Sequence, residues 1–174
     1  MASGPSLTSE DIEAVRLSGL PVIVVNSTWE KVRFCKALYA GDSAWWIKNK
    51  SLIDVDCEKW ICSSPTAASL KLKYRRNPFG KRFNSGANAV ELAANHYCAD
   101  RVLMLGFDCS VENGIHHHDD HVGLNNPNQK RCEIWREHFL RLPKLCKKTE
   151  LINCSRFTRI DSIKKGALED YLES

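Results

Sequence analysis

Asn84–His121 reads NSGANAVELAANHYCADRVLMLGFDCSVENGIHHHDDH, and this stretch decides how we interpret the rest of the chain. A polar loop at Asn84–Gly86 precedes apolar residues at helical spacing, which predict a helix over Ala87–Asp100. The apolar run that follows predicts a buried strand over Val102–Phe107, and a group of histidines lies beyond it. Ligands of open α/β sheets bind outside the carboxyl ends of the strands. The order of these elements therefore makes Asp108, at the end of the predicted strand, a candidate site residue.

Strands and helices alternate along the rest of the chain. The β-branched run Val22–Val25 is typical of a strand that is buried on both faces, as in parallel sheets. Further strands are predicted at Ala37–Ala40, around Trp60–Cys62, at the edge segment Lys71–Arg76 and at Leu151–Cys154. Further helices are predicted from a cap at Ser6 or Thr8 to about Arg16, over Arg131–Lys148 with Pro143 kinking it or ending it early, and over Ala167–Leu172. This alternation predicts an α/β fold of three layers with a mostly parallel sheet, in a single domain over residues 1–174.

The composition is that of an ordinary globular protein. The chain has 174 residues, of which 43% are hydrophobic and 26% charged, and its formal net charge is +4. No apolar run approaches the roughly 18 residues that a membrane-spanning helix needs. The mild positive charge falls short of that of a dedicated nucleic-acid-binding protein, but it suits an anionic small ligand such as a nucleotide.

The amino end and the cysteines favour a cytoplasmic location. Met1–Ser6 lacks the basic start and the apolar core of a signal peptide. The eight cysteines include no C-x-x-C pair, so the spacing of a zinc ribbon is absent. Cys98, Cys109 and Cys154 lie in apolar runs, where a thiol behaves as a small hydrophobic group. We therefore expect reduced thiols in the cytosol.

Polar residues follow several of the predicted strands. Asn26, after the first strand, fits either a ligand contact or a turn. After the second strand, Trp45 and Trp46 could form a stacking platform for a base or a sugar, but aromatic residues next to a short strand are more often in the core. Asp42 is therefore the stronger candidate for a ligand contact there. Ser85 either caps the helix that it precedes or donates a hydrogen bond to a phosphate there.

The turn Gly4-Pro5-Ser6 also has two interpretations. It is either a flexible terminus with a capped helix behind it, or a glycine-containing turn whose backbone N–H groups face a phosphate. The sequence alone favours neither strongly.

The histidine cluster His116–His121 has three interpretations. Histidine and aspartate together suit zinc, manganese or a similar metal ion. A histidine with a pKa near neutrality could instead act as a general base. The third interpretation is a polar surface loop. A magnesium ion carried in with a nucleotide and held by Asp42 or Asp108 is a separate candidate cofactor.

Six of the twelve residues in the stretch from Lys71 to Arg82 are basic. Such a stretch is usually a solvated face. Alternatively, it attracts an anionic substrate, or binds nucleic acid through phosphate contacts.

Several short motifs occur along the chain in one order: Gly4-Pro5-Ser6-Leu7, Val25-Asn26, Asn84-Ser85-Gly86, Leu105-Gly106-Phe107-Asp108 and the downstream histidines. This order resembles a Rossmann-like superfamily that includes the bacterial sialyltransferases, which use CMP-sialic acid, and the motility accessory factor and 6-hydroxymethylpterin pyrophosphokinase-like proteins. The chain looks most similar to small phage and prophage proteins of this superfamily, often called morphogenetic proteins. In the superfamily an apolar strand precedes the Gly-Pro-Ser turn, whereas here that strand is missing or starts upstream of Met1.

The resemblance implies a nucleotide site with a general base beside it. The nucleotide-binding residues are then Gly4, Pro5, Ser6, Asn26, Asn84, Ser85, Gly86, Gly106 and Asp108, with Asp42 added as the polar residue after the second strand. In the sialyltransferases a histidine of the later loop is the base, which implies His117, His118 or His121 here, next to Asp108 as a further catalytic candidate.

The first functional hypothesis is a phage-encoded, nucleotide-dependent transferase that moves a glycosyl or phosphoryl-type group from a nucleotide or nucleotide-sugar donor. The second is a protein that binds a nucleotide or a nucleotide-derived signal without turnover. The third is a nucleic-acid-binding protein that uses the basic stretch 71–82. The sequence does not specify the base, the acceptor or the oligomeric state.

Overall fold

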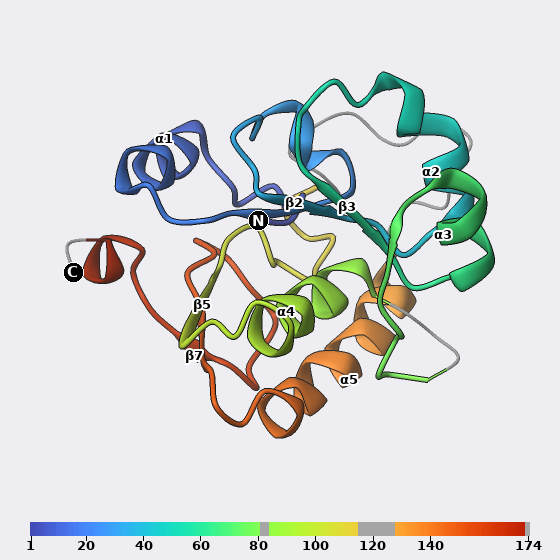
Figure 1. Ribbon diagram of the computed structural model, residues 1–174. Helices are drawn as coiled ribbons and strands as arrows, with labels where there is room; N and C mark the ends of the chain where they lie inside the picture. Colours follow the sequence, from blue (N-terminus) through green and yellow to red (C-terminus); the bar gives the residue numbers. More distant parts are fainter. Residues whose placement is uncertain (81–83, 115–127, 173–174) are drawn as a thin grey trace.

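The computed structural model describes residues 1–80, 84–114 and 128–172, with two parallel β-sheets at its centre (Figure 1). One sheet has the strand order β1-β2-β3-β4 and the other has the order β5-β6-β7. The strands are β1 (Ile23–Val25), β2 (Ala37–Tyr39), β3 (Glu58–Ile61), β4 (Lys73–Tyr74), β5 (Arg101–Met104), β6 (Glu150–Asn153) and β7 (Lys164–Lys165). The predicted α/β class with parallel strands is confirmed.

The first residues of the chain connect the two sheets. The Met1 nitrogen donates to the Ile23 carbonyl over 2.7 Å, and the Val25 N–H donates to the Met1 carbonyl over 3.0 Å. On the other side, the Ala2 N–H donates to the Leu105 carbonyl over 2.8 Å. Met1 and Ala2 therefore lie between β1 and β5, where the resemblance implies a strand.

A cavity of about 330 Å³ continues from Met1 toward the amino ends of β1 and β5. Its walls are mostly apolar and include Val22, which precedes β1, Ile23 and Leu103 from the strands, and Ala93 from the helix Ser85–Asn95. The short Met1–Ala2 segment thus fills only one end of the space between the two sheets.

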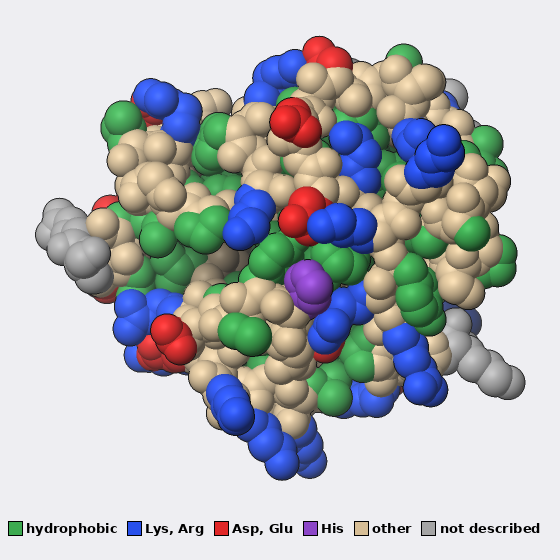
Figure 2. Space-filling view, in the orientation of Figure 1, with side chains coloured by type: hydrophobic (Ala, Val, Ile, Leu, Met, Phe, Trp, Pro, Cys, Tyr) green, Lys and Arg blue, Asp and Glu red, His purple; other side chains and the backbone are tan. Residues whose placement is uncertain are grey.

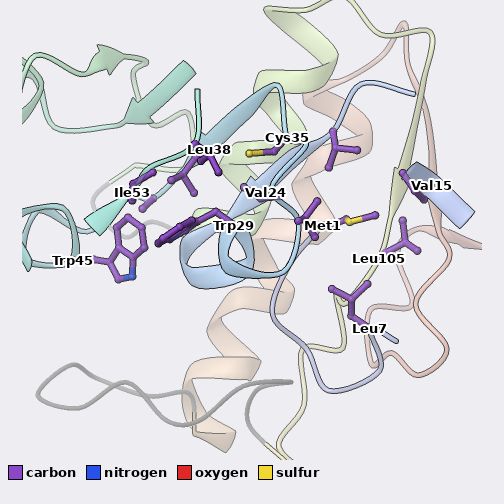
Figure 3. Packing of buried hydrophobic residues seen from close by; sticks show 14 of the residues in the cluster. Met1, Leu7, Val15, Val24, Trp29, Cys35, Leu38, Trp45, Ile53 and Leu105 are labelled. Atoms are coloured by element: carbon purple, nitrogen blue, oxygen red, sulfur yellow. The ribbon is translucent and has the colours of Figure 1, made fainter. Parts of the chain in front are cut away.

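Helices follow the strands on both faces. They are α1 (Ser9–Ser18), α2 (Ser43–Asn49), α3 (Ser64–Leu70), α4 (Ser85–Asn95) and α5 (Gln129–Leu145), with short 3₁₀ turns η1 (Asn26–Glu30), η2 (Lys50–Leu52) and η3 (Glu169–Tyr171). Neighbouring side chains of β1 point to opposite faces: Val24 packs in the cluster that contains Val15 of α1 (Figure 3), whereas Val25 packs with Leu92 of α4. Figure 1 shows α4 and α5 next to each other, which completes the three layers.

The amino-terminal helix is capped by Thr8, one of the two predicted caps, whose hydroxyl accepts from the Asp11 N–H. Two other predictions about the helices need correction. Pro143 lies inside α5 and does not end it at that position, although the helix stops at Leu145 and not at the predicted Lys148. A proline this near the end removes a single backbone bond, and the Cys146 N–H still donates to the Leu142 carbonyl. The last predicted helix is only the 3₁₀ turn η3.

No helix in the described ranges is both long and apolar enough to cross a membrane.

Candidate functional site

The carboxyl ends of the parallel strands bring most of the predicted site residues to one edge of the protein. Asn26 follows β1, Asp42 follows β2, and Asp108 follows β5. Gly4 and Ser6 follow the Met1–Ala2 segment, which runs between β1 and β5. Since parallel strands all end at the same edge, residues far apart in the sequence meet there.

The closest contact at this edge joins Ser6 to Asp108. The Ser6 N–H donates to one Asp108 carboxylate oxygen over 2.9 Å, and the Ser6 hydroxyl donates to the other. The Gly4 N–H donates to the Gly106 carbonyl over 2.9 Å, which holds the two turns side by side. The Gly-Pro-Ser turn is thus held by the acidic turn and is not a flexible terminus, although the capped helix expected behind it is present. The alternative in which its N–H groups face a phosphate is not what the structure shows either, because the Gly4 and Ser6 N–H groups donate to Gly106 and Asp108.

Gly4 and Gly106 both lie where the structure leaves no room for a side chain. A side chain at Gly4 would collide with the Asp108 carboxylate, and one at Gly106 would collide with the Ala2 carbonyl. Gly106 also has a φ of 71°, which side chains disfavour. The two glycines let two backbone segments approach each other around one carboxylate.

Asp108 is a buried acid without a counter-charge. Its exposed fraction is 2%, and no ion pair joins it to a cation within residues 1–80, 84–114 and 128–172. Burial raises the pKa of Asp108 above its ordinary value, and the two hydrogen bonds from Ser6 oppose that rise only in part. A buried acid with a perturbed pKa is typical of a functional site.

The start of α4 lies against the same edge. Asn84 caps the helix by accepting from the Ala87 N–H over 2.8 Å, so the cap is Asn84 and not Ser85. The Ser85 hydroxyl instead accepts from the Gly41 N–H over 3.0 Å. A side chain at Gly86 would lie 2.9 Å from the Phe107 ring, so the Asn84–Gly86 motif packs directly beside the residue that precedes Asp108.

Asn26 and Asp42 differ in how the fold uses them. Asp42 caps α2 by accepting from the Ala44 N–H over 2.8 Å, and the expected core positions of Trp45 and Trp46 are confirmed at 2% and 0% exposure. Asn26 has a φ of 50° at the start of η1, and its side chain makes no hydrogen bond within the described part of the chain. Asp42 therefore has a local structural role, whereas the Asn26 amide is available to a ligand.

The histidine cluster His116–His121, with the candidate bases His117, His118 and His121, lies outside the described residues. The described chain before it stops at Gly114, where a side-chain carbon would be 4.0 Å from Pro5. Within the residues that the structure describes, no group of three or more His, Cys, Asp or Glu side chains could hold a metal ion.

Three residues that we did not single out from the sequence support the acidic turn. The Phe107 N–H donates to the Ser155 hydroxyl, and the Thr158 hydroxyl donates to the Phe107 carbonyl, both over 2.8 Å. Arg136 of α5 donates to the Cys109 carbonyl over 3.3 Å, which places a cation one residue beyond Asp108. Ser155 and Thr158 are polar residues that follow β6, and that pattern could have identified them from the sequence. No pattern singles out Arg136, which lies within an amphipathic helix.

The basic stretch that begins at Lys71 is partly neutralised by the fold. Lys73 pairs with Glu58 over 2.9 Å, and Arg75 pairs with Glu91 over 2.6 Å. Figure 2 shows Lys and Arg side chains scattered over the visible face among acidic and apolar ones. Two of the charges that suggested nucleic-acid binding thus have internal partners.

Comparisons of the chain with protein-family models, with curated proteins and with solved structures gave no match of any kind.

Proposed function

We propose that the carboxyl edge of the sheet binds a nucleotide or nucleotide sugar, and that the protein is a transferase acting on that donor. The observation that carries the proposal is Asp108, an acid with 2% exposure whose side-chain partners within the described part of the chain both belong to the neutral Ser6. A fold selected only for stability would pair such an acid with a cation or replace it, because a buried charge without a counter-charge is unfavourable.

Each part of the edge offers a chemistry that a nucleotide needs. The amino end of α4, with Ser85 at its first residue, presents N–H groups and a positive dipole end suited to phosphate. The Asn26 amide can donate and accept, and Asp108 can accept from hydroxyl groups of a sugar. Arg136 adds a cation near the acidic turn. A magnesium ion would enter with the phosphates of the ligand.

A histidine of the segment 116–121 is proposed as the base that takes a proton from the acceptor hydroxyl. The order of the motifs along the chain, and its resemblance to the sialyltransferase superfamily, support this part of the proposal. His118→Ala and His121→Ala should each leave donor binding intact and lower turnover. If both variants turn over the donor as the unmodified chain does, the base is not among them.

The first test is a thermal-shift screen against nucleotides and nucleotide sugars, with and without magnesium. A ligand that binds only the folded state must raise the melting temperature. Asp108→Asn should strongly reduce the shift, whereas Glu150→Gln, which loses only exposed ion pairs at the amino end of β6, should keep it. Phosphorus NMR of the donor that binds then separates a transferase from a protein that binds without turnover. A flat screen with folded protein would refute the nucleotide assignment.

A further inference from the structure

Three buried polar groups next to the candidate site have no hydrogen-bond partner. They are the Thr28 hydroxyl and the indole N–H groups of Trp29 and Trp45, and none of them is bonded to any described residue. The exposed fractions of the three residues are 0%, 7% and 2%. Folded proteins satisfy nearly all such groups, so three in one region require an explanation.

The three groups lie just behind the carboxyl edge. Thr28 and Trp29 belong to η1, which starts at Asn26 directly after β1. Trp45 is in the first turn of α2, directly after β2. All three side chains come from neighbouring strand ends, and both rings belong to one packed cluster (Figure 3).

A neighbouring tryptophan shows what a satisfied indole looks like in this fold. The Trp46 N–H donates to the Ala40 carbonyl over 2.9 Å, although Trp46 is as deeply buried as Trp45. The fold is therefore able to satisfy an indole N–H in this region, and does so one residue away. The lack of partners at Trp29 and Trp45 is specific to those two positions.

The chemistry of the three groups selects a neutral ligand group. Two N–H donors and a hydroxyl can bind acceptor atoms, but the surrounding cluster consists of apolar side chains such as Ile53 and Val55. Burial of a phosphate there without a cation would be strongly unfavourable. A planar, neutral acceptor such as the carbonyl of a nucleobase suits both the donors and the aromatic rings.

We propose that Thr28, Trp29 and Trp45 form a subsite for the base of the bound nucleotide, with Asn26 at its entrance. The proposal of this subsite rests on the proposed nucleotide function. It places the base at the segments that follow β1 and β2, and the sugar and phosphates toward Ser85 and Asp108. The three groups are buried in the ligand-free protein, so the base must displace the atoms that cover them. Binding therefore changes the surroundings of the two indole N–H groups.

The test uses variants that replace an indole, with its N–H, by the smaller phenyl ring. Trp29→Phe and Trp45→Phe are compared with the matched variant Trp46→Phe, by titration with CMP, UMP, AMP and GMP. Ribose 5-phosphate is the matched probe without a base. We expect Trp29→Phe and Trp45→Phe each to weaken binding of the best monophosphate about fivefold, as the loss of a neutral hydrogen bond does. Their affinity for ribose 5-phosphate should not fall, whereas their melting temperatures should fall, because the smaller ring leaves a cavity in the core.

Trp46→Phe leaves the same kind of cavity and also loses a satisfied hydrogen bond, so its melting temperature should fall furthest, while its affinity for the monophosphate stays unchanged. In ¹⁵N spectra of tryptophan-labelled protein, the indole signals of Trp29 and Trp45 should move on addition of the monophosphate, while that of Trp46 stays. If the monophosphate binds and neither the affinities nor those signals change in this way, the subsite is refuted and the nucleotide function stands. If neither the four monophosphates nor ribose 5-phosphate bind to the folded chain, both proposals are refuted.

Discussion

Three acids of the described residues, Asp11, Glu91 and Asp108, are almost completely buried, and the last two are held in opposite ways. Glu91, in α4, is 6% exposed and accepts two hydrogen bonds from the Arg75 guanidinium, over 2.9 and 2.6 Å. Asp108, at 2% exposure, accepts side-chain hydrogen bonds only from the neutral Ser6 among residues 1–80, 84–114 and 128–172. The fold provides a counter-charge where the acid is structural and withholds one at the strand edge. That difference distinguishes a stabilising ion pair from a candidate site.

Loss of the counter-charge of Glu91 should have the largest effect. Arg75→Met leaves Glu91 buried and unpaired, so we expect the free energy of unfolding to fall by about 3 kcal/mol. Urea denaturation measures it. Arg101→Met is the matched control, because its pair with Glu150 is exposed at 44% and 42% and should contribute less than about 1 kcal/mol. Equal losses for the two variants would remove the contrast between Glu91 and Asp108.

Neutralisation of Asp108 should affect binding and leave the fold intact. Asp108→Asn still accepts a hydrogen bond from Ser6 but has no charge, so donor binding should weaken by about 2 kcal/mol, roughly thirtyfold, as for a hydrogen bond to a charged group. Calorimetric titration measures the affinity, and thermal unfolding measures the stability. A variant that binds as the unmodified chain does, or that unfolds much more easily, would make Asp108 a structural residue like Glu91.

Ser85→Ala tests the link between α4 and the loop after β2. The variant leaves the Gly41 N–H without its partner at 3.0 Å, and we expect a loss of about 1 kcal/mol in the free energy of unfolding. If Ser85 also contacts phosphate, donor affinity falls as well. Ser9→Ala, in the first turn of α1, is the control for the loss of a serine from a helix start. Identical stability of both variants would mean that the Gly41 contact contributes nothing.

The smallest expected effect is a pH dependence that belongs to Asp108. Its pKa is raised by burial in the folded protein, so the folded state holds the proton more tightly than the unfolded state. The cost of the charge is absent below the unfolded pKa of about 3.9 and grows as pH rises through the folded pKa. The melting temperature of Asp108→Asn minus that of the unmodified chain should therefore increase as pH rises from 4 to 7. Each kcal/mol that the charge costs the unmodified chain adds about 2–4 °C to this difference. A constant difference across that range would contradict the raised pKa.

The sequence predicted the elements whose signal is local. The β-branched run at Val22–Val25 and the apolar run before Asp108 identified β1 and β5. The rule that ligands bind outside the carboxyl ends of parallel strands identified that edge of the sheet as the candidate site. Asn84 and Ser85 are both good capping residues, so the sequence could not assign the cap. The contact of Ser6 with Asp108 spans 102 positions, and no local pattern encodes it. The resemblance suggested that these motifs share a site but not which atoms meet, and the function stays a prediction.

The position of Met1 and Ala2 has a consequence for hydrogen exchange. The Val25 N–H donates to the Met1 carbonyl, and the Ala2 N–H donates to the Leu105 carbonyl. Each of these amides exchanges only when its bond opens, so the two signals report whether the sheets of β1 and β5 separate at that point. Slower exchange at Val25 after addition of a ligand would show that binding at the carboxyl edge also stabilises the connection between the two sheets.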